Sequence, residues 1–184
     1  VEEHLLIDWK SSRIHEIPGR TGRNAIDRNL RILAQTIAGV VRDMSPTMIC
    51  MCEVGERKQP LSADQMQQLS TQVMSAWQDA AAEQIQLRSM FTTGSPYMTV
   101  YIDGPIKCSN HRILHNVYYA DGEPRDAQTF VCSFLDRESV DIVVVHAPSG
   151  QKQPKDSQRQ TLLTKLLQSI SQARLGRTIR NAYF

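Results

Sequence analysis

The 184-residue sequence predicts a mixed α/β fold in which sheets are flanked by helices. Three observations support this class. Apolar residues recur at helical spacing in three segments, short apolar runs lie between and after them, and Gly- and Pro-containing stretches separate the runs. The resulting order is β-α-β-α, then several strands, then α, which is typical of layered α/β domains. We expect residues 1–184 to form one domain, because this length supports one sizeable core.

The first four elements follow from apolar spacing. Leu5–Trp9 is a short apolar strand candidate, and the polar stretch Ser11–Arg23 is expected to be a loop. Asn24–Arg42 is a predicted helix. Thr47–Cys52 is the next strand, and its near-continuous apolar run is typical of a strand covered on both faces. The apolar face of the helix consists of Ile26, Leu30, Leu33, Ile37 and Val40.

A second helix is expected to begin after Ser62, since Ser62 and Gln65 match a capping box. Its apolar stripe consists of Met66, Leu69, Val73 and Trp77. Several strands are expected next, with turns at 94–96 and 121–124, and an amphipathic helix over Asp156–Arg174 ends the order. The strand candidates are Ile85–Phe91, Tyr97–Asp103, Arg112–Tyr118, Gln128–Leu135 and Val140–His146.

Composition and charge argue against several classes of protein. The net charge of +2 is too small to imply a polyanionic partner by itself. No membrane span is expected, because no run of about 18 apolar residues occurs. The N-terminal segment lacks a basic region followed by a long apolar run, so it does not match an intact signal peptide.

The four cysteines form no C-x-x-C motif; they are Cys50, Cys52, Cys108 and Cys132. A zinc site would need more ligands at closer spacing. We therefore expect reduced, buried, structural thiols, which favour a reducing intracellular compartment.

The carboxylate of Glu53 directly follows the apolar run Thr47–Cys52. A charge at the end of a buried strand needs a partner. One interpretation is an Mg²⁺ ligand, because this hard ion prefers oxygen donors and ligands gather at the carboxyl ends of strands in open α/β sheets. The alternative is an ion pair with Arg13 or Arg23 that has no chemical role.

His146 ends the apolar run Val140–His146 in the same way. An imidazole at a strand end can protonate or hydrogen-bond a phosphate, although a lone histidine is more often a structural residue. If the strands that carry Glu53 and His146 are neighbours in one sheet, both side chains face the same crevice.

Two basic groups are candidate substrate-binding residues. The first is the segment PGRTGR, with Arg20 and Arg23; the second is Lys152 with Lys155 and Arg159. The first group precedes a helix N-terminus, which favours anions, but it is not a P-loop and its helical context does not suit a KH module. A solvated capping loop and the exposed start of an amphipathic helix are the respective alternatives.

Two motifs resemble the endonuclease/exonuclease/phosphatase superfamily. TMICMCEVGE, which contains Glu53, resembles the second-strand motif, where an apolar strand ends in a metal-binding glutamate. VDIVVVHAPSG followed by DSQRQTLLTKLLQSI resembles the strand–histidine–helix block. The order of predicted elements is also similar, and the resemblance covers nearly the whole chain. It implies a four-layered α/β/β/α sandwich, of which this chain resembles about the first two-thirds.

The resemblance also implies an activity, the hydrolysis of phosphate esters with Mg²⁺ or Mn²⁺. Substrates of the superfamily include DNA, RNA, inositol phosphates and sphingomyelin. By this resemblance Glu53 would be the metal ligand, and His146 would be the catalytic histidine that contacts the phosphate. Tyr97 and Tyr101 both fit the tyrosine that many members place on a middle strand.

The sequence departs from the superfamily at several points. Lys10 stands where an asparagine that helps position the metal is expected, and an ammonium group would repel the ion. The later motifs Gly-Asp-x-Asn and Asp-His have no counterpart, so we expect the C-terminal part of the fold to be missing from this sequence. Half of a sandwich leaves an open sheet edge and an apolar face. We expect a protein partner or the missing segment to cover them.

Two main functional hypotheses follow. One is a Mg²⁺-dependent phosphodiester or phosphomonoester hydrolase by descent, with an active site that is incomplete in this chain. The other is a catalytically inactive pseudoenzyme, an interaction subunit of a larger complex in which the metal has been lost. A third, weaker hypothesis is nucleic-acid binding through Pro18–Arg23.

Overall fold

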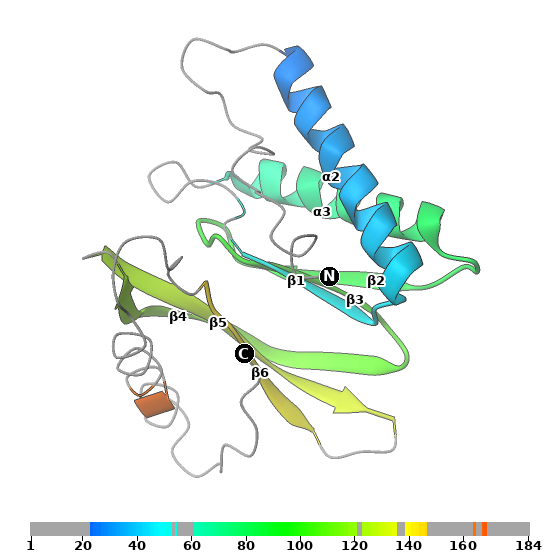
Figure 1. Ribbon diagram of the computed structural model, residues 1–184. Coiled ribbons are helices and arrows are strands. Elements are labelled where there is room, and N and C mark those ends of the chain that lie inside the picture. The colour runs from blue at the N-terminus through cyan, green and yellow to red at the C-terminus, as the bar shows by residue number, and fades with distance from the viewer. Residues whose placement is uncertain are drawn as a thin grey trace. The chain divides into compact units, whose positions relative to one another are not determined.

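The computed structural model describes residues 23–52, 54, 61–120, 123–135, 139–146, 164, 167 and 168 (Figure 1). Two compact units are distinguished: Val1–Lys107 with Ser133–Glu138, and Cys108–Cys132 with Ser139–Phe184. The polypeptide therefore passes from one unit to the other more than once. The expectation of one domain over residues 1–184 stays a prediction.

The described elements form a mixed α/β fold, as predicted. The helices are α2 (Arg23–Met44) and α3 (Ala63–Ala80), and the strands are β1 (Met48–Met51), β2 (Leu87–Phe91), β3 (Met98–Ile102), β4 (Ile106–Ala120), β5 (Glu123–Phe134) and β6 (Val140–Val144). They build two three-stranded sheets, with the orders β1-β3-β2 and β4-β5-β6. The predicted strands after α3 are all present, and β4 and β5 are longer than the sequence indicated.

Helices α2 and α3 cover one face of the first sheet (Figure 1). α2 buries Leu33, Ile37 and Val41, whereas the predicted Val40 is only partly buried. The helix ends where Ser45 adopts a left-handed φ of 45° and its N–H donates to the Val41 carbonyl at 3.0 Å. The prediction is therefore confirmed for Leu33 and Ile37 and wrong for Val40, while the side chains of Ile26 and Leu30 lie outside the described ones.

The start of α3 confirms the predicted capping box. Ser62 Oγ accepts a hydrogen bond from the Gln65 N–H at 3.2 Å, and Gln65 Oε1 accepts one from the Ser62 N–H at 2.8 Å. The four predicted core residues of this helix are each at most 1% exposed: Met66, Leu69, Val73 and Trp77. Local sequence therefore determined both the start of α3 and the face that it buries.

β3 is the central strand of the first sheet and runs antiparallel to β1 and β2. Met98 and Val100 are fully buried in the core that the two helices cover. The turn before β3 lies where the sequence predicts it, because Ser95 N–H donates to the Thr92 carbonyl at 3.0 Å and Gly94 supplies the required positive φ of 81°.

β1 is covered on one face only, contrary to the prediction. Met51 points into the core, whereas Cys50 points to the opposite face and is exposed. The expectation that all four cysteines are buried is therefore wrong for Cys50, while Cys132 is buried. An apolar run indicates a strand, but it does not reveal how many faces of that strand the rest of the chain covers.

β5 is the central strand of the second sheet, and residues 127–132 are buried along it. β6 pairs with it antiparallel, from Gln128 opposite Val144 to Cys132 opposite Val140. Three side-chain contacts relate β4 to β5: Cys108–Cys132, His111–Gln128 and His115–Asp126. Because the numbers rise along β4 as they fall along β5, this pair is antiparallel too.

β4 carries one residue more than β5 between two of these contacts. From Cys108 to His115 the chain advances seven residues, whereas from Asp126 to Cys132 it advances six. Asn110, with a φ of 54°, lies in this interval, and asparagine tolerates the left-handed conformation that such an insertion requires. A β-bulge therefore adjusts the register of β4 against β5.

Some predicted elements lie outside the described residues. These are the strand Leu5–Trp9, the loop before Arg23 and most of the helix Asp156–Arg174. Within that last range, Thr164, Leu167 and Gln168 are described and are helical. None of the described helices is long and apolar enough to cross a membrane.

Candidate functional site

Most of the site residues predicted from the sequence lie outside the described part. They are Glu53, Arg20 and Lys152. Arg23 is the first residue of α2, but its side chain is not described. Of the predicted catalytic and metal-binding residues, the structure therefore describes His146, whose side chain is partly buried.

The strands that lead to the two predicted catalytic residues are both present. β1 ends at Met51, two residues before Glu53, and β6 ends at Val144, two residues before His146. They belong to different sheets, so the condition under which both side chains would face one crevice, neighbouring strands in one sheet, is not met. Antiparallel pairing places β1 beside β3 in the first sheet and β6 beside β5 in the second.

The chain just beyond β1 lies beside the start of β3. Val54 is buried, and its N–H donates to the Pro96 carbonyl at 2.9 Å. Tyr97 follows Pro96 and is buried, as is Tyr101 of β3. Both tyrosines predicted from the resemblance are thus internal residues of the first unit, and Tyr97 is the one next to the residue that binds Val54.

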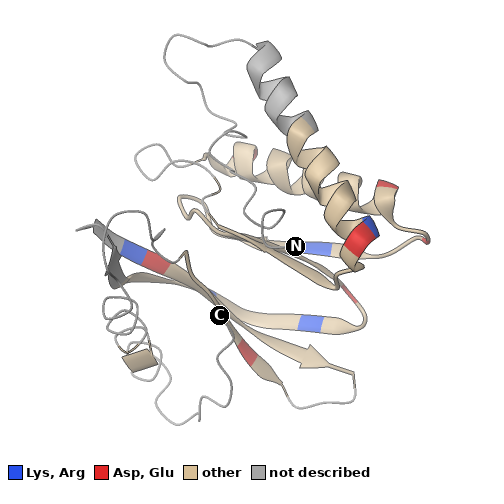
Figure 2. Ribbon diagram, in the orientation of Figure 1, with Lys and Arg blue, Asp and Glu red and all other residues tan. Residues whose placement is uncertain are grey.

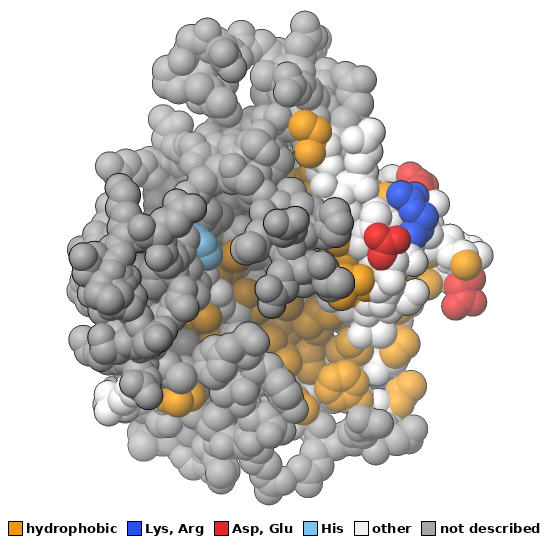
Figure 3. All heavy atoms as spheres, viewed as in Figure 1, with side chains coloured by type: hydrophobic (Ala, Val, Ile, Leu, Met, Phe, Trp, Pro, Cys, Tyr) orange, Lys and Arg blue, Asp and Glu red, His pale blue; other side chains and the backbone are white. Residues whose placement is uncertain are grey.

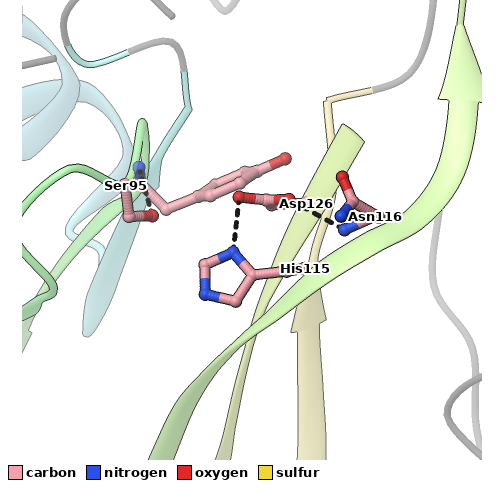
Figure 4. A network of polar contacts seen from close by, with 5 residues as sticks. Ser95, His115, Asn116 and Asp126 are labelled. Atoms are coloured by element: carbon pink, nitrogen blue, oxygen red, sulfur yellow. Dashed lines mark hydrogen bonds and ion pairs between the residues drawn. The ribbon is translucent and has the colours of Figure 1, made fainter. Parts of the chain in front are cut away.

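A cluster of polar side chains joins β4 to β5, and the sequence analysis did not predict it. Asp126 Oδ2 lies 3.0 Å from His115 Nδ1, and Asp126 Oδ1 accepts a hydrogen bond from the Asn116 N–H at 2.9 Å (Figure 4). Asn116 has a positive φ of 55°, which turns its N–H toward the carboxylate. The Asp126 carboxylate therefore contacts both the imidazole of His115 and the backbone of Asn116.

This arrangement orients the imidazole of His115. A carboxylate at Nδ1 favours the tautomer that keeps a proton there, which leaves Nε2 as a hydrogen-bond acceptor and base. The His115 side chain is 70% exposed and that of Asp126 is 20% exposed, so the ring is accessible while its anchor is largely covered. Such a histidine can accept a proton from water, or it can bind an anion when protonated.

A second histidine of β4 is held differently. His111 Nε2 lies 3.0 Å from Gln128 Nε2, and Gln128 is fully buried. Because an amide nitrogen only donates, the ring nitrogen of His111 must accept, which requires the neutral imidazole. Burial also lowers the pKa of His111 below its ordinary value of 6.5. His111 is therefore a structural residue.

The sequence does contain a signal for the His115–Asp126 pair. The predicted turn at 121–124 lies between the two residues, and an antiparallel hairpin around it brings residues at similar distances from the turn together. The bulge in β4 makes the register uncertain by one residue, and a shift of one residue reverses the side-chain faces. The sequence therefore predicts His115–Asp126 as one of a few candidate cross-strand pairs, but it does not determine which of them forms.

The described residues do not form a metal site. Among them, no group of three or more His, Cys, Asp or Glu side chains is arranged to hold an ion. Glu53, the predicted ligand, is not among them. The donor set that Mg²⁺ prefers is therefore not assembled by the described side chains alone.

Figure 2 shows both basic and acidic residues scattered over the described helices and strands. Arg88 of β2 pairs with Asp103 just after β3, and the hydrogen bond and charge of Asp103 raise the pKa of Arg88. This ion pair links the outer strand β2 to the residue that follows β3, which is a structural role. The anion-binding segment Pro18–Arg23 lies almost wholly outside the described residues, so nucleic-acid binding there stays a prediction.

Solved structures of TDP2 from Caenorhabditis elegans are similar to this chain in fold. A selenomethionine form matches with a TM-score of 0.45 and 15% identity over 88% of this chain and 42% of that one. A truncated form matches with a TM-score of 0.45 and 14% identity over 81% of this chain and 53% of that one. A third structure matches with a TM-score of 0.45 and 15% identity over 88% of this chain and 43% of that one. This chain thus spans about half of the solved chains or less.

No protein-family model matches the sequence, and no curated protein does. The residues of the chain itself therefore carry the functional proposal.

Proposed function

We propose that this chain is an endonuclease/exonuclease/phosphatase-like domain, by descent a Mg²⁺-dependent phosphoester hydrolase whose active site is incomplete within the chain. The observation that supports the proposal is that the described apolar run of each motif forms a strand, as expected. An apolar strand leads to Glu53, another leads to His146, and each is the outermost described strand of a three-stranded antiparallel sheet.

The chain contributes its own groups to such a reaction. His146, two residues after the end of β6, would contact a phosphate oxygen, and Glu53 would bind Mg²⁺ or Mn²⁺. A bound divalent ion would neutralise charge on the phosphate. The oriented His115 adds an imidazole that can accept a proton from water. Phosphodiesters, including those of nucleic acids, and phosphomonoesters are the proposed substrate class.

The alternative is an inactive interaction subunit, and the exposure of large apolar side chains favours it. Leu135 is 75% exposed and Met44 is 54% exposed. Hydrophobic side chains also gather on the face of the molecule seen in Figure 3. Contiguous apolar surface of this kind marks interaction sites in soluble proteins. A protein partner, or a segment outside this sequence, would cover it.

Thermal melting in the presence of Mg²⁺ or Mn²⁺ tests the proposal. A ligand at 100 times its Kd stabilises the folded state by about 2.7 kcal/mol. For a chain of this size that corresponds to a rise in Tm of about 5–10 °C. We expect Glu53→Gln to abolish the rise. Glu83→Gln, which changes an exposed glutamate in the link between α3 and β2, should leave it intact.

The outcomes separate the two functions. A Tm that responds to neither ion would remove the hydrolase hypothesis for this chain and leave the interaction subunit. A rise that survives Glu53→Gln would show that the ion binds elsewhere, which contradicts the proposed site. A rise lost only in Glu53→Gln supports the metal-binding role, and release of phosphate or nucleotides from model esters then identifies the substrate class.

A further inference from the structure

Two cysteines face each other across the second sheet. Cys108 on β4 and Cys132 on β5 have their Sγ atoms 3.4 Å apart, and neither forms a disulfide in this structure. We propose that this pair is a reversible modification site, in which a peroxide converts the two thiols into an intramolecular disulfide between β4 and β5. The proposal does not depend on the phosphoester function.

The geometry of the pair suits a disulfide. A sulfur–sulfur bond is about 2.05 Å long and joins residues whose Cβ atoms are about 3.5–4.5 Å apart. Directly opposed residues on antiparallel strands approach that separation, about 4.5–5.5 Å between Cβ atoms. The remaining gap between the sulfurs is small enough for side-chain rotation and a slight approach of the strands to close it. No other part of the sheet needs to rearrange.

The two thiols differ in access and in acidity. Cys132 is buried, whereas Cys108 is partly exposed. The hydrogen bond from Cys108 lowers the pKa of the Cys132 thiol, and the burial of Cys132 opposes this effect. The thiolate is the reactive form of cysteine. An oxidant therefore reaches Cys108 first, while Cys132 lies beside it as the thiol that ionises more readily.

The reaction balances with peroxide as the two-electron oxidant. The Cys108 sulfur attacks one peroxide oxygen, the O–O bond breaks, and Cys108 becomes a sulfenic acid as the first water leaves. The Cys132 thiolate then attacks the Cys108 sulfur. The S–S bond forms, the S–O bond breaks, and the departing hydroxide takes up the proton that Cys132 released, giving a second water. Thiol exchange with a reductant such as glutathione reverses the process.

The other two cysteines provide an internal control. Cys50 and Cys52 are separated by two positions along β1 and its extension, so their Cα atoms are about 6.6 Å apart along the strand. That spacing is at the upper limit for a disulfide, and the two side chains lean in the same direction. Cys50 is nevertheless exposed. Simple accessibility would favour oxidation at Cys50, whereas pairing geometry favours Cys108 and Cys132.

The experiment treats the reduced chain with a modest excess of hydrogen peroxide and maps the products by differential alkylation and peptide mass spectrometry. We expect one cross-linked peptide that contains Cys108 and Cys132, formed in the monomer and reversed by glutathione. We also expect the oxidised chain to melt about 5 °C or more above the reduced chain, because the disulfide closes a loop of 24 residues.

Two variants complete the design. Cys108→Ser changes the partly exposed partner and should abolish both the cross-link and the rise in Tm, whereas Cys50→Ser should preserve both. The wild-type mapping does not depend on either variant, so the proposal remains testable if a variant fails to fold. Oxidation that leaves Cys108 and Cys132 open to alkylation, or that stops at a sulfinic acid or an intermolecular disulfide, would overturn the proposal.

Discussion

Gln128 and His111 form a side-chain contact that fixes a protonation state. The amide nitrogen of the fully buried Gln128 lies 3.0 Å from Nε2 of His111, so the ring must accept the hydrogen bond. Burial penalises the protonated ring, and protonation of His111 would also set two donors against each other. The lowered pKa of His111 is the result.

A dependence of stability on pH follows from this contact. The unfolded chain takes up a proton on His111 as the pH falls below its ordinary pKa of 6.5, whereas the folded chain does not until a lower pH. We expect the contribution of His111 to the free energy of unfolding to be fully present above about pH 6.5 and to decline as the pH falls toward the folded-state pKa. Urea unfolding at a series of pH values measures this decline.

Two variants assign the effect to its residue. His111→Gln keeps a group that can accept from Gln128 and removes the titration, so the decline should become shallower. Ser75→Ala changes an exposed side chain that does not titrate and should leave the decline as in the wild type. Equal slopes in His111→Gln and the wild type would refute the assignment.

The capping box of α3 makes a second prediction. Ser62→Ala removes the acceptor for the Gln65 N–H and should lower the free energy of unfolding by about 1 kcal/mol. Ser75→Ala, at an exposed position inside the same helix, should be neutral or stabilise by up to about 0.5 kcal/mol. Chemical denaturation measures both values. A loss of similar size in the two variants would mean that the cap does not determine the effect.

The polar cluster on β4 and β5 makes a third prediction. Asp126→Ala removes the acceptor of the Asn116 N–H, so this amide should exchange with solvent about tenfold faster. His115→Gln removes the ring and keeps that acceptor, so the same amide should stay protected. Hydrogen exchange followed by NMR resolves this single amide. Protection that persists in Asp126→Ala would show that the backbone at Asn116 is held by other contacts.

Local patterns predicted much of the first unit. The capping box at Ser62 and the stripe from Met66 to Trp77 were read correctly, because helix caps and helical faces depend on residues within a few positions of each other. The turn at Gly94 was found for the same reason, since only a positive φ allows that turn. The helix over α2 was predicted to within two residues at either end.

Other features could not be read from such patterns. The exposure of Cys50 depends on which distant segments cover the second face of β1. The residues next to Cys50 in the sequence do not determine that. The pairing of His115 with Asp126 depends on a bulge that shifts the register by one residue. For the predicted ligand Glu53, the sequence motif remains the basis of the assignment.

The sequence by itself determined the order of the described elements and most of the residues that α2 and α3 bury, because these properties arise from contacts within a few residues along the chain. Only the tertiary structure decided that β1 and β6 belong to different sheets, that Cys108 meets Cys132, and that Asp126 holds His115. Those facts depend on strand pairing between distant segments. The free energy of that pairing comes from packing across the whole sheet, and no short stretch of sequence encodes it.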